Sequence, residues 1–221
     1  MRKIVFLVVS IATIGILWIF TTASIPSEST PPTQTTDNRP AAFAVLAAGC
    51  LEGDGAACFE LALKHYNAEG TLQDLDEAAR LFQAACEAGE GGGCANLGLM
   101  YASGVGARQD YAQAATLYRE ACDLKAGGGC ANLGVLYANG HGVAQDYAQA
   151  AGLYEEACTL GDATGCSNLG LLYAQGNGVA QDRERALALF KEACHRAHEA
   201  GCHNMRVLSE EMGRDPKRSI Q

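Results

Sequence analysis

Apolar residues recur along most of the chain with the spacing of helices that bury one face. Between residues 91 and 126, Leu97 and Tyr101 lie four apart, and a second apolar stripe follows a polar, glycine-containing gap. Residues three or four apart share one side of a helix, so both stripes predict amphipathic helices. Gly104 and Gly106 separate them, because glycine adopts the left-handed conformation that ends a helix. The second stripe consists of Ala114, Leu117, Tyr118 and Ala121.

Polar residues and glycines mark where these helices begin, end and approach each other. The second helix opens at Asp110, whose side chain can accept from free backbone N–H groups, with Gln113 at the position of a capping box. Gly98 lets the two helices of a pair approach closely, and the run 91–93 predicts a glycine-rich turn between pairs. The pattern therefore predicts helix pairs joined by tight connections.

The same pattern repeats every thirty-six residues. A fixed period of this size indicates a solenoid, in which each unit buries its apolar face against its neighbours. The predicted fold is all-α, an αα-hairpin solenoid of about four repeats with half-repeat caps and one disulfide per repeat junction. Four full units span 55–90, 91–126, 127–162 and 163–198, a partial unit spans 199–206, and residues 41–50 form a capping helix, so the solenoid covers 41–206.

The two ends of the chain differ in composition from the repeats. Arg2 and Lys3 precede an apolar run over residues 4–20, which predicts an export signal. Its seventeen residues also reach the lower limit for crossing a bilayer, so residues 1–23 are either a cleaved signal peptide or an N-terminal membrane anchor. Residues 24–40 are rich in Ser, Thr and Pro and predict a disordered linker, and 207–221 form a tail.

Charge and cysteine content narrow the class of protein. The net charge of −9 over 221 residues argues against nucleic-acid binding, which needs a basic patch. Ten cysteines indicate an oxidising compartment, so we expect an extracytoplasmic protein, periplasmic or secreted and possibly tethered to the inner membrane through residues 4–20. Buried free thiols or zinc ligands are the alternative, although paired zinc ligands usually lie about two to four residues apart.

One motif runs through the repeats and resembles a known family. Leu97-Gly98-x-x-Tyr101-x-x-Gly104-x-Gly106, followed by Gln109-Asp110 and Ala114, is similar to the Sel-one-like repeat family, relatives of the tetratricopeptide repeats. The period and paired cysteines resemble its bacterial cysteine-rich branch. The first unit departs from the motif with His65 for the tyrosine, and the fifth with Arg206 for the glycine. The resemblance implies a curved stack of antiparallel helix pairs that binds protein partners. It also implies an alternative, because some cysteine-rich members are described as binding or slowly hydrolysing β-lactams.

The cysteines can pair across eight residues or across twenty-eight. The longer pairing leaves Cys50 and Cys202 without partners, whereas the shorter one uses every cysteine and suits a helix, tight turn and helix. A redox-catalytic role is disfavoured because catalytic pairs usually have the spacing Cys-x-x-Cys. The predicted disulfides are Cys50–Cys58, Cys86–Cys94, Cys122–Cys130, Cys158–Cys166 and Cys194–Cys202.

A polar stripe on the first helix of each pair is the candidate binding surface. In each repeat an asparagine stands two residues after a cysteine, as Asn96 does after Cys94, and a polar residue follows seven positions later on the same side of the helix. An amide both donates and accepts, so a ladder of them suits the backbone of an extended peptide, although simple solvation is the alternative. The candidate peptide-contact residues are Asn96, Asn132, Asn168, Asn204, Ser103, Asn139 and Gln175.

Evidence for catalysis or metal binding in the sequence is weak. His195 and His198 share a helical face near His203 and Glu199, a pattern that can bind zinc or copper but is more often an exposed polar end. The serine β-lactamase motifs and His-Glu-x-x-His are absent. We therefore predict an exported scaffold, without cofactor or metal, that binds a protein or extended peptide in its concave groove. The alternative is a weak β-lactamase-like hydrolase or a binder of cell-wall fragments.

Overall fold

The computed structural model describes residues 39–213 and contains ten helices and no strand in that range. The described residues all belong to one compact unit. The predicted export signal and most of the predicted linker lie outside the described residues. The helices are α1 Arg39–Leu51, α2 Gly55–Asn67, α3 Leu75–Glu87, α4 Gly91–Ser103, α5 Tyr111–Asp123, α6 Gly127–Asn139, α7 Tyr147–Thr159, α8 Ala163–Gln175, α9 Arg183–His195 and α10 Glu199–Gly213.

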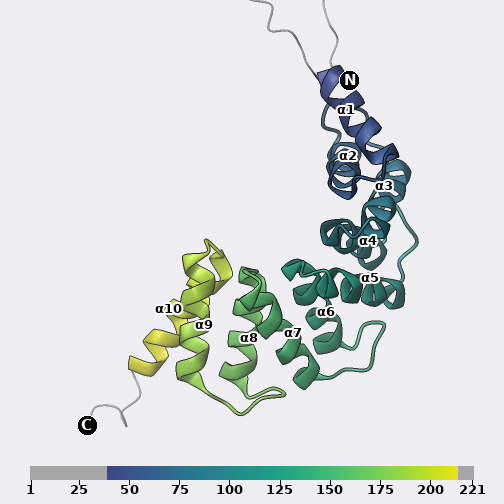
Figure 1. Cartoon of the computed structure of the whole chain (residues 1–221). Coiled ribbons are helices and arrows are strands. Elements are labelled where there is room, and N and C mark those ends of the chain that lie inside the picture. The colour runs from purple at the N-terminus through teal and green to yellow at the C-terminus, as the bar shows by residue number, and fades with distance from the viewer. Residues whose placement is uncertain (1–38, 214–221) are drawn as a thin grey trace, which may run out of the picture. The chain divides into compact units, whose positions relative to one another are not determined.

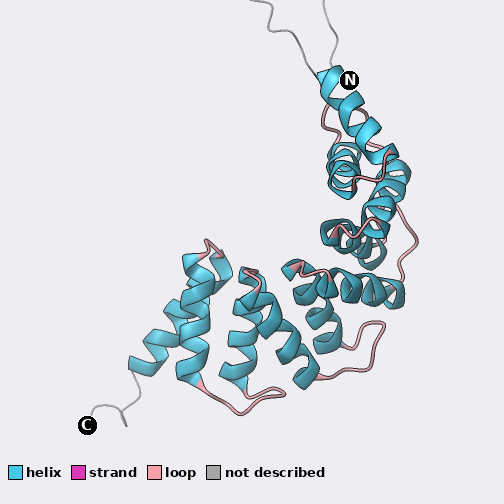
Figure 2. Ribbon diagram, in the orientation of Figure 1, coloured by secondary structure: helices cyan, strands magenta, loops and turns pink. Residues whose placement is uncertain are grey.

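The helices follow one another in chain order, and each packs against the next (Figure 1). Even-numbered helices also contact the next even-numbered helix, whereas odd-numbered helices make at most marginal contact with one another. We call the two sides of this stack the even-helix face and the odd-helix face. Short loops follow the odd-numbered helices and longer ones follow α2, α4, α6 and α8 (Figure 2). The predicted all-α solenoid of helix pairs is confirmed.

A Gln-Asp dipeptide organises each longer loop. Gly104 ends α4 in the left-handed conformation, and the Gln109 side chain then donates to the carbonyl of Ala102 at 2.8 Å. Asp110 accepts from two backbone N–H groups of α5, while its own N–H donates to the Tyr101 carbonyl. Because that N–H is already used, the reciprocal bond of the expected capping box is not made. The dipeptide thus satisfies unpaired groups of both helix ends at once.

In the second, third and fourth repeats, a glycine on the first helix of the pair admits an aromatic ring from the second helix. A Cβ atom built on Gly134 would lie 2.6 Å from the ring of Tyr154, and one on Gly98 would lie 2.8 Å from Tyr118. Both rings are almost fully buried. Desolvation by burial raises the pKa of each of these tyrosines from 10.0 to about 12. The close approach predicted at Gly98 is therefore present, and the ring it admits is a core residue.

A second glycine position lies where consecutive repeats pack against each other, and the prediction of a glycine-rich turn there is wrong. Gly91 to Gly93 do not form a turn but occupy the first turn of α4, and the reversal lies in the preceding residues 88–90. The physical reason is contact: a Cβ on Gly93 would lie 2.6 Å from Cβ of Ala85 across the junction. The first junction reverses the pair, with Gly49 on α1 against Ala57 on α2.

Each junction between helix pairs carries one disulfide, as predicted. All ten cysteines are paired with the cysteine eight positions away, and no thiol is free. Cys58, Cys94, Cys130 and Cys166 are completely buried, so four of the five bonds are part of the core. Each closes a short loop and stabilises the fold by restricting the unfolded chain, by roughly 2–3 kcal/mol in the loop-entropy view. At the fourth disulfide, Cys158–Cys166, Arg196 donates to the backbone carbonyl of Cys158 and to Sγ of Cys166.

The two ends of the stack differ from the predicted caps. Residues 207–213 were expected in a tail, but they continue α10, because Leu208 and Met212 pack with Phe190 in the last core cluster. At the other end, Phe43 of α1 makes an edge-on ring contact with His65 at 5.3 Å. The Nδ1 atom of His65 is buried without a hydrogen-bond partner among residues 39–213. None of the helices in this range is both long enough and apolar enough to cross a membrane.

Candidate functional site

The predicted asparagine stripe lies on α4, α6, α8 and α10, the even-numbered helices that contact one another. Asn132 and the other three asparagines are half-buried, whereas Ser103, Asn139 and Gln175 at the helix ends are exposed. Between these two sets lies an apolar position that the sequence analysis did not single out. It is occupied by Leu99, Val135, Leu171 and Val207, three residues after each asparagine. The even-helix face therefore combines amides with partly exposed aliphatic side chains.

The four asparagines differ in their hydrogen bonds. Asn96 donates its side-chain N–H to the carbonyl of Gly92 in its own helix at 2.8 Å. The side chains of Asn132, Asn168 and Asn204 have no hydrogen-bond partner within residues 39–213. A half-buried amide that lacks a protein partner must bond to water or to a ligand. The amides of Asn132, Asn168 and Asn204 can thus bond to a ligand, whereas the amide of Asn96 already makes one hydrogen bond within its own helix.

A small hollow opens on this face between α8 and α10. It measures about 140 Å³, and Phe190 of α9 lies at its base. Leu171 and Val207 supply apolar walls, while Asn204 and Glu211 add polar atoms. The hollow is large enough for an aliphatic side chain beside an amide that can bond to the backbone. An asparagine of the stripe, Asn204, therefore lines a cavity on the even-helix face.

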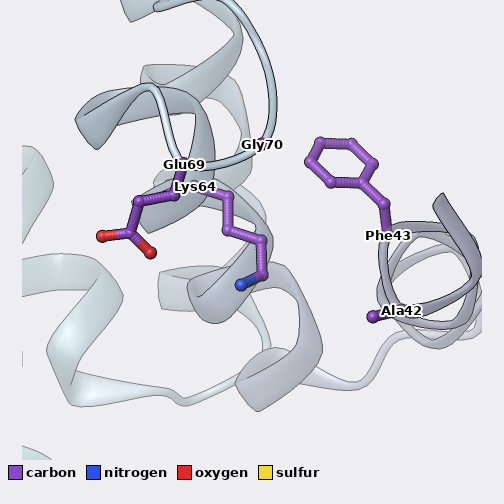
Figure 3. Close-up of a pocket in the computed structure, with 5 residues that line it drawn as sticks. All are labelled: Ala42, Phe43, Lys64, Glu69 and Gly70. Atoms are coloured by element: carbon purple, nitrogen blue, oxygen red, sulfur yellow. The ribbon is translucent and has the colours of Figure 1, made fainter. Parts of the chain in front are cut away.

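A second cavity, of about 240 Å³, lies at the N-terminal end of the stack between α1 and α2. Figure 3 shows the Phe43 ring on α1 facing the side chain of Lys64 on α2, with Glu69 at the following loop. Lys64 is already 3.7 Å from the carboxylate of Glu60, so its charge is partly balanced. The cavity combines an aromatic ring with one basic and one acidic side chain, a set that suits binding.

The histidine side chains are not among the groups of potential metal ligands that lie close together within residues 39–213. His198 accepts from the backbone N–H of Gly201 and so caps α10, while His195 and His203 are exposed. Groups of three potential ligands within residues 39–213 involve only disulfide-bonded cysteines with Glu120 or Glu156. A sulfur already bonded to sulfur is not a thiolate and does not ligate a metal as one.

No serine within residues 39–213 is placed beside a base. Ser103 donates to the carbonyl of Leu99, Ser209 donates to that of Arg206, and Ser167 is buried on α8. A serine nucleophile needs a hydrogen-bonded base such as histidine or lysine to take its proton. The even-helix face can therefore bind through amides and apolar side chains, and we assign it no catalytic chemistry.

Comparison with known proteins agrees with this architecture. The Sel1 repeat family matches residues 55–90, 92–125, 128–162 and 163–198, together well over half of the chain. A comparison with curated proteins gives no match. Among solved structures, the chain is similar to a protective antigen of uropathogenic Escherichia coli displaying an SLR fold, with 31% identity and a TM-score of 0.67. The alignment covers 72% of this chain and 34% of that antigen, so the chain spans about a third of its length.

Two further structures extend the comparison. A Sel1 repeat protein from Oxalobacter formigenes has 24% identity and a TM-score of 0.67, with 79% of this chain and 78% of that one covered, and shows the fold alone. The Helicobacter pylori cysteine rich protein B has 34% identity over 59% of this chain and 94% of its own, with a TM-score of 0.49. The repeat matches over well over half of the chain lead to one conclusion: the chain belongs to the Sel1 repeat family.

Proposed function

We propose that this Sel1 repeat protein is a scaffold that binds an extended segment of a partner protein along its even-helix face. Proteins of this repeat family generally mediate protein–protein interactions. One observation supports binding along this face. Asn132, Asn168 and Asn204 have half-buried amides without protein partners, and the helices that carry them contact one another. Each amide can both donate to and accept from a peptide backbone.

The apolar positions beside the asparagines supply the second half of the recognition. Leu171 and Val207 flank the hollow next to Asn204, so a bound segment can place an aliphatic side chain there while the amide holds its backbone. Main-chain bonds then provide affinity and the hollow provides sequence preference, as in other modes of peptide recognition. Ser103, Asn139 and Gln175 extend the polar edge of the same surface. No observation within residues 39–213 favours the alternative of β-lactam hydrolysis.

Selection from a displayed random-peptide library on the disulfide-bonded protein tests this proposal. Peptides that bind are synthesised, and their affinities are measured calorimetrically for the wild type, Asn132→Ala and Asn168→Ala. Loss of one net hydrogen bond of roughly 0.5–1.5 kcal/mol weakens binding up to about tenfold. Gln113→Ala is the matched control, because Gln113 is an exposed amide residue on the odd-numbered helix α5.

Stability must be measured beside affinity. Leu133 is 2% exposed, so Leu133→Ala leaves a cavity and lowers the free energy of unfolding by roughly 2–5 kcal/mol. We expect the asparagine variants to melt near the wild-type temperature and to bind weakly. Selected peptides that bind Asn132→Ala and Asn168→Ala at full strength would show that the stripe is not the binding surface.

We further propose that residues 4–20 direct export and hold the chain at the inner membrane when they are not removed. The five disulfides support an extracytoplasmic location, because such bonds persist in oxidising compartments. Intact-mass measurement of the protein from its native envelope tests the tether. A chain that starts at Met1 and fractionates with membranes is the expected result, and a start near Ser24 contradicts anchoring.

A further inference from the structure

The even-helix face presents an apolar row beside its amides, and this row has the period of the repeats. Leu99, Val135, Leu171 and Val207 occupy equivalent positions on α4, α6, α8 and α10, thirty-six residues apart. Leu99 is 45% exposed and Val207 is 40% exposed. The hollow of about 140 Å³ lies between Leu171 and Val207, two consecutive members of the row. The face therefore offers one apolar contact per repeat.

The middle of this face carries no charge. Helices α4, α6 and α8 contain no Asp, Glu, Lys, Arg or His, whereas the odd-numbered helices α3, α5, α7 and α9 all carry charged residues. At the borders, the carboxylates of Glu90 and Asp162 cap α4 and α8, and Glu211 of α10 lies 3.4 Å from Arg183. Arg108 lies beyond the C-terminal end of α4. A charged side chain laid on the middle of the face would lose water without gaining a partner, so the face suits neutral residues.

The spacing of the even-numbered helices fits one conformation of a bound chain. Helices α4, α6, α8 and α10 contact one another in turn, and the axes of helices in contact lie about 8–10 Å apart. A polyproline II chain has three residues per turn, so every third side chain points to the same side at intervals of about 9.3 Å. In a β-strand, side chains on one side recur every second residue, at about 6.7 Å. The polyproline II period matches one repeat, and the strand period does not.

The asparagines distinguish this conformation from a bound helix. A polyproline II backbone makes no internal hydrogen bonds, so its carbonyls can accept from outside. The carbonyls of a helix already accept from N–H groups of its own next turn. The side-chain N–H groups of Asn132, Asn168 and Asn204 have no partner within residues 39–213, and each asparagine lies three residues before a member of the apolar row. One amide and one apolar contact per repeat thus correspond to one carbonyl and one side chain per turn of the bound chain.

We propose that the even-helix face binds an uncharged, proline-containing segment of a partner protein in the polyproline II conformation, with an apolar residue at every third position. This inference rests on the proposed function and specifies the class of partner for the same surface. Each apolar residue enters the space between two successive even-numbered helices, as in the hollow between Leu171 and Val207. There the amide of Asn204 donates to a carbonyl of the segment. The spaces α4–α6, α6–α8 and α8–α10 together take about nine residues at three per turn.

Peptides of equal composition test the period on the full, disulfide-bonded chain. The first peptide is three copies of Leu-Pro-Gln between an acetyl and an amide group. The second has the same residues in the order Leu-Gln-Leu-Gln-Leu-Gln-Pro-Pro-Pro, which gives its leucines the period of a strand. Titrations followed by NMR through the side-chain amide signals of Asn132 and Asn168 are expected to show at least about tenfold tighter binding of the first peptide, because the second leaves a leucine in water. Equal or tighter binding of the second peptide overturns the polyproline II assignment.

A charge exchange tests where the peptide lies. Three copies of Leu-Pro-Glu are expected to bind the wild type about tenfold more weakly than three copies of Leu-Pro-Gln. Asn139→Lys places a cation at the exposed end of α6 on this face and is expected to restore binding of the glutamate peptide. Gln113→Lys makes the same change in charge at an exposed residue of α5 and is expected to restore nothing. Equal restoration by the two variants contradicts the placement.

The outcomes separate this inference from the proposed function. If peptides selected from the random library lose affinity in Asn132→Ala, but three copies of Leu-Pro-Gln do not bind, the even-helix face is a peptide surface and the polyproline II assignment is wrong. If three copies of Leu-Pro-Gln bind equally well to the wild type, Asn132→Ala and Asn168→Ala, the peptide lies elsewhere, and both proposals are wrong.

Discussion

A methyl group added at Gly134 tests whether close packing within a repeat depends on glycine. The added Cβ would lie 2.6 Å from Cε1 and 2.8 Å from Cδ1 of Tyr154, whereas carbon atoms in contact prefer about 3.5–4.0 Å. The ring would have to move by roughly 1 Å, and Tyr154 is 3% exposed, so its surroundings are close-packed. Overpacking of this kind costs about 1–3 kcal/mol.

Gly152→Ala is the matched control for Gly134→Ala. Gly152 also lies inside a helix, but its added Cβ meets nothing within 4 Å. Replacing an interior helical glycine with alanine gains about 0.8–1 kcal/mol in either variant, so the difference between the two isolates the contact with Tyr154. We expect Gly152→Ala to be more stable than the wild type and Gly134→Ala to be less stable than Gly152→Ala by about 1–3 kcal/mol.

Guanidinium unfolding followed by circular dichroism, with all disulfides intact, measures this difference. The first repeat already has an alanine at the position of Gly134. This residue, Ala62, is completely buried and shares a core cluster with Phe82. If both alanine variants gain the same stability, the α6–α7 pair spreads to accept a methyl group, and glycine is not required for the approach.

Three further predictions concern a helix cap, the response to alkali and the fourth disulfide. Asp146→Ala removes the acceptor for two backbone N–H groups at the start of α7 and should cost about 1 kcal/mol in chemical unfolding, whereas Asp123→Ala, an exposed carboxylate at a helix end, should be neutral. The contribution of Tyr118 and Tyr154 to the free energy of unfolding should be fully present below pH 10 and should be lost between pH 10 and about 12. In that range these tyrosines ionise in the unfolded chain but stay protonated in the folded one. The slope is about 1.4 kcal/mol per pH unit for each tyrosine, and replacing both with Phe should flatten it. Arg196→Leu should slow reduction of the fourth disulfide by dithiothreitol several-fold, because the guanidinium lies 3.4 Å from Sγ of Cys166 and stabilises the leaving thiolate. The rate is measured by alkylation followed by mass spectrometry, and an unchanged rate would contradict this role of Arg196.

The sequence alone determined the helix pairs, because their signals are local and repeat. Gly104 and Asp110 mark the end of one helix and the start of the next, and each acts on backbone groups within a few residues. The disulfide pattern followed from the same periodicity, since a short turn brings cysteines eight apart together in every copy. Repetition turned weak local preferences into one consistent fold, and this is why the prediction of a solenoid succeeded.

The tertiary structure alone decided the roles that depend on contacts between repeats. Gly93 looked like a turn residue, but it serves the approach of Ala85, which no local pattern encodes. Residues 207–213 extend α10 because Leu208 and Met212 pack against the buried ring of Phe190. The surroundings of a tyrosine such as Tyr137 depend on side chains of another helix, since Arg119 of α5 donates to its hydroxyl. Such side chains either fill the space between neighbouring helices or leave it open, and that space exists only once the helices are stacked.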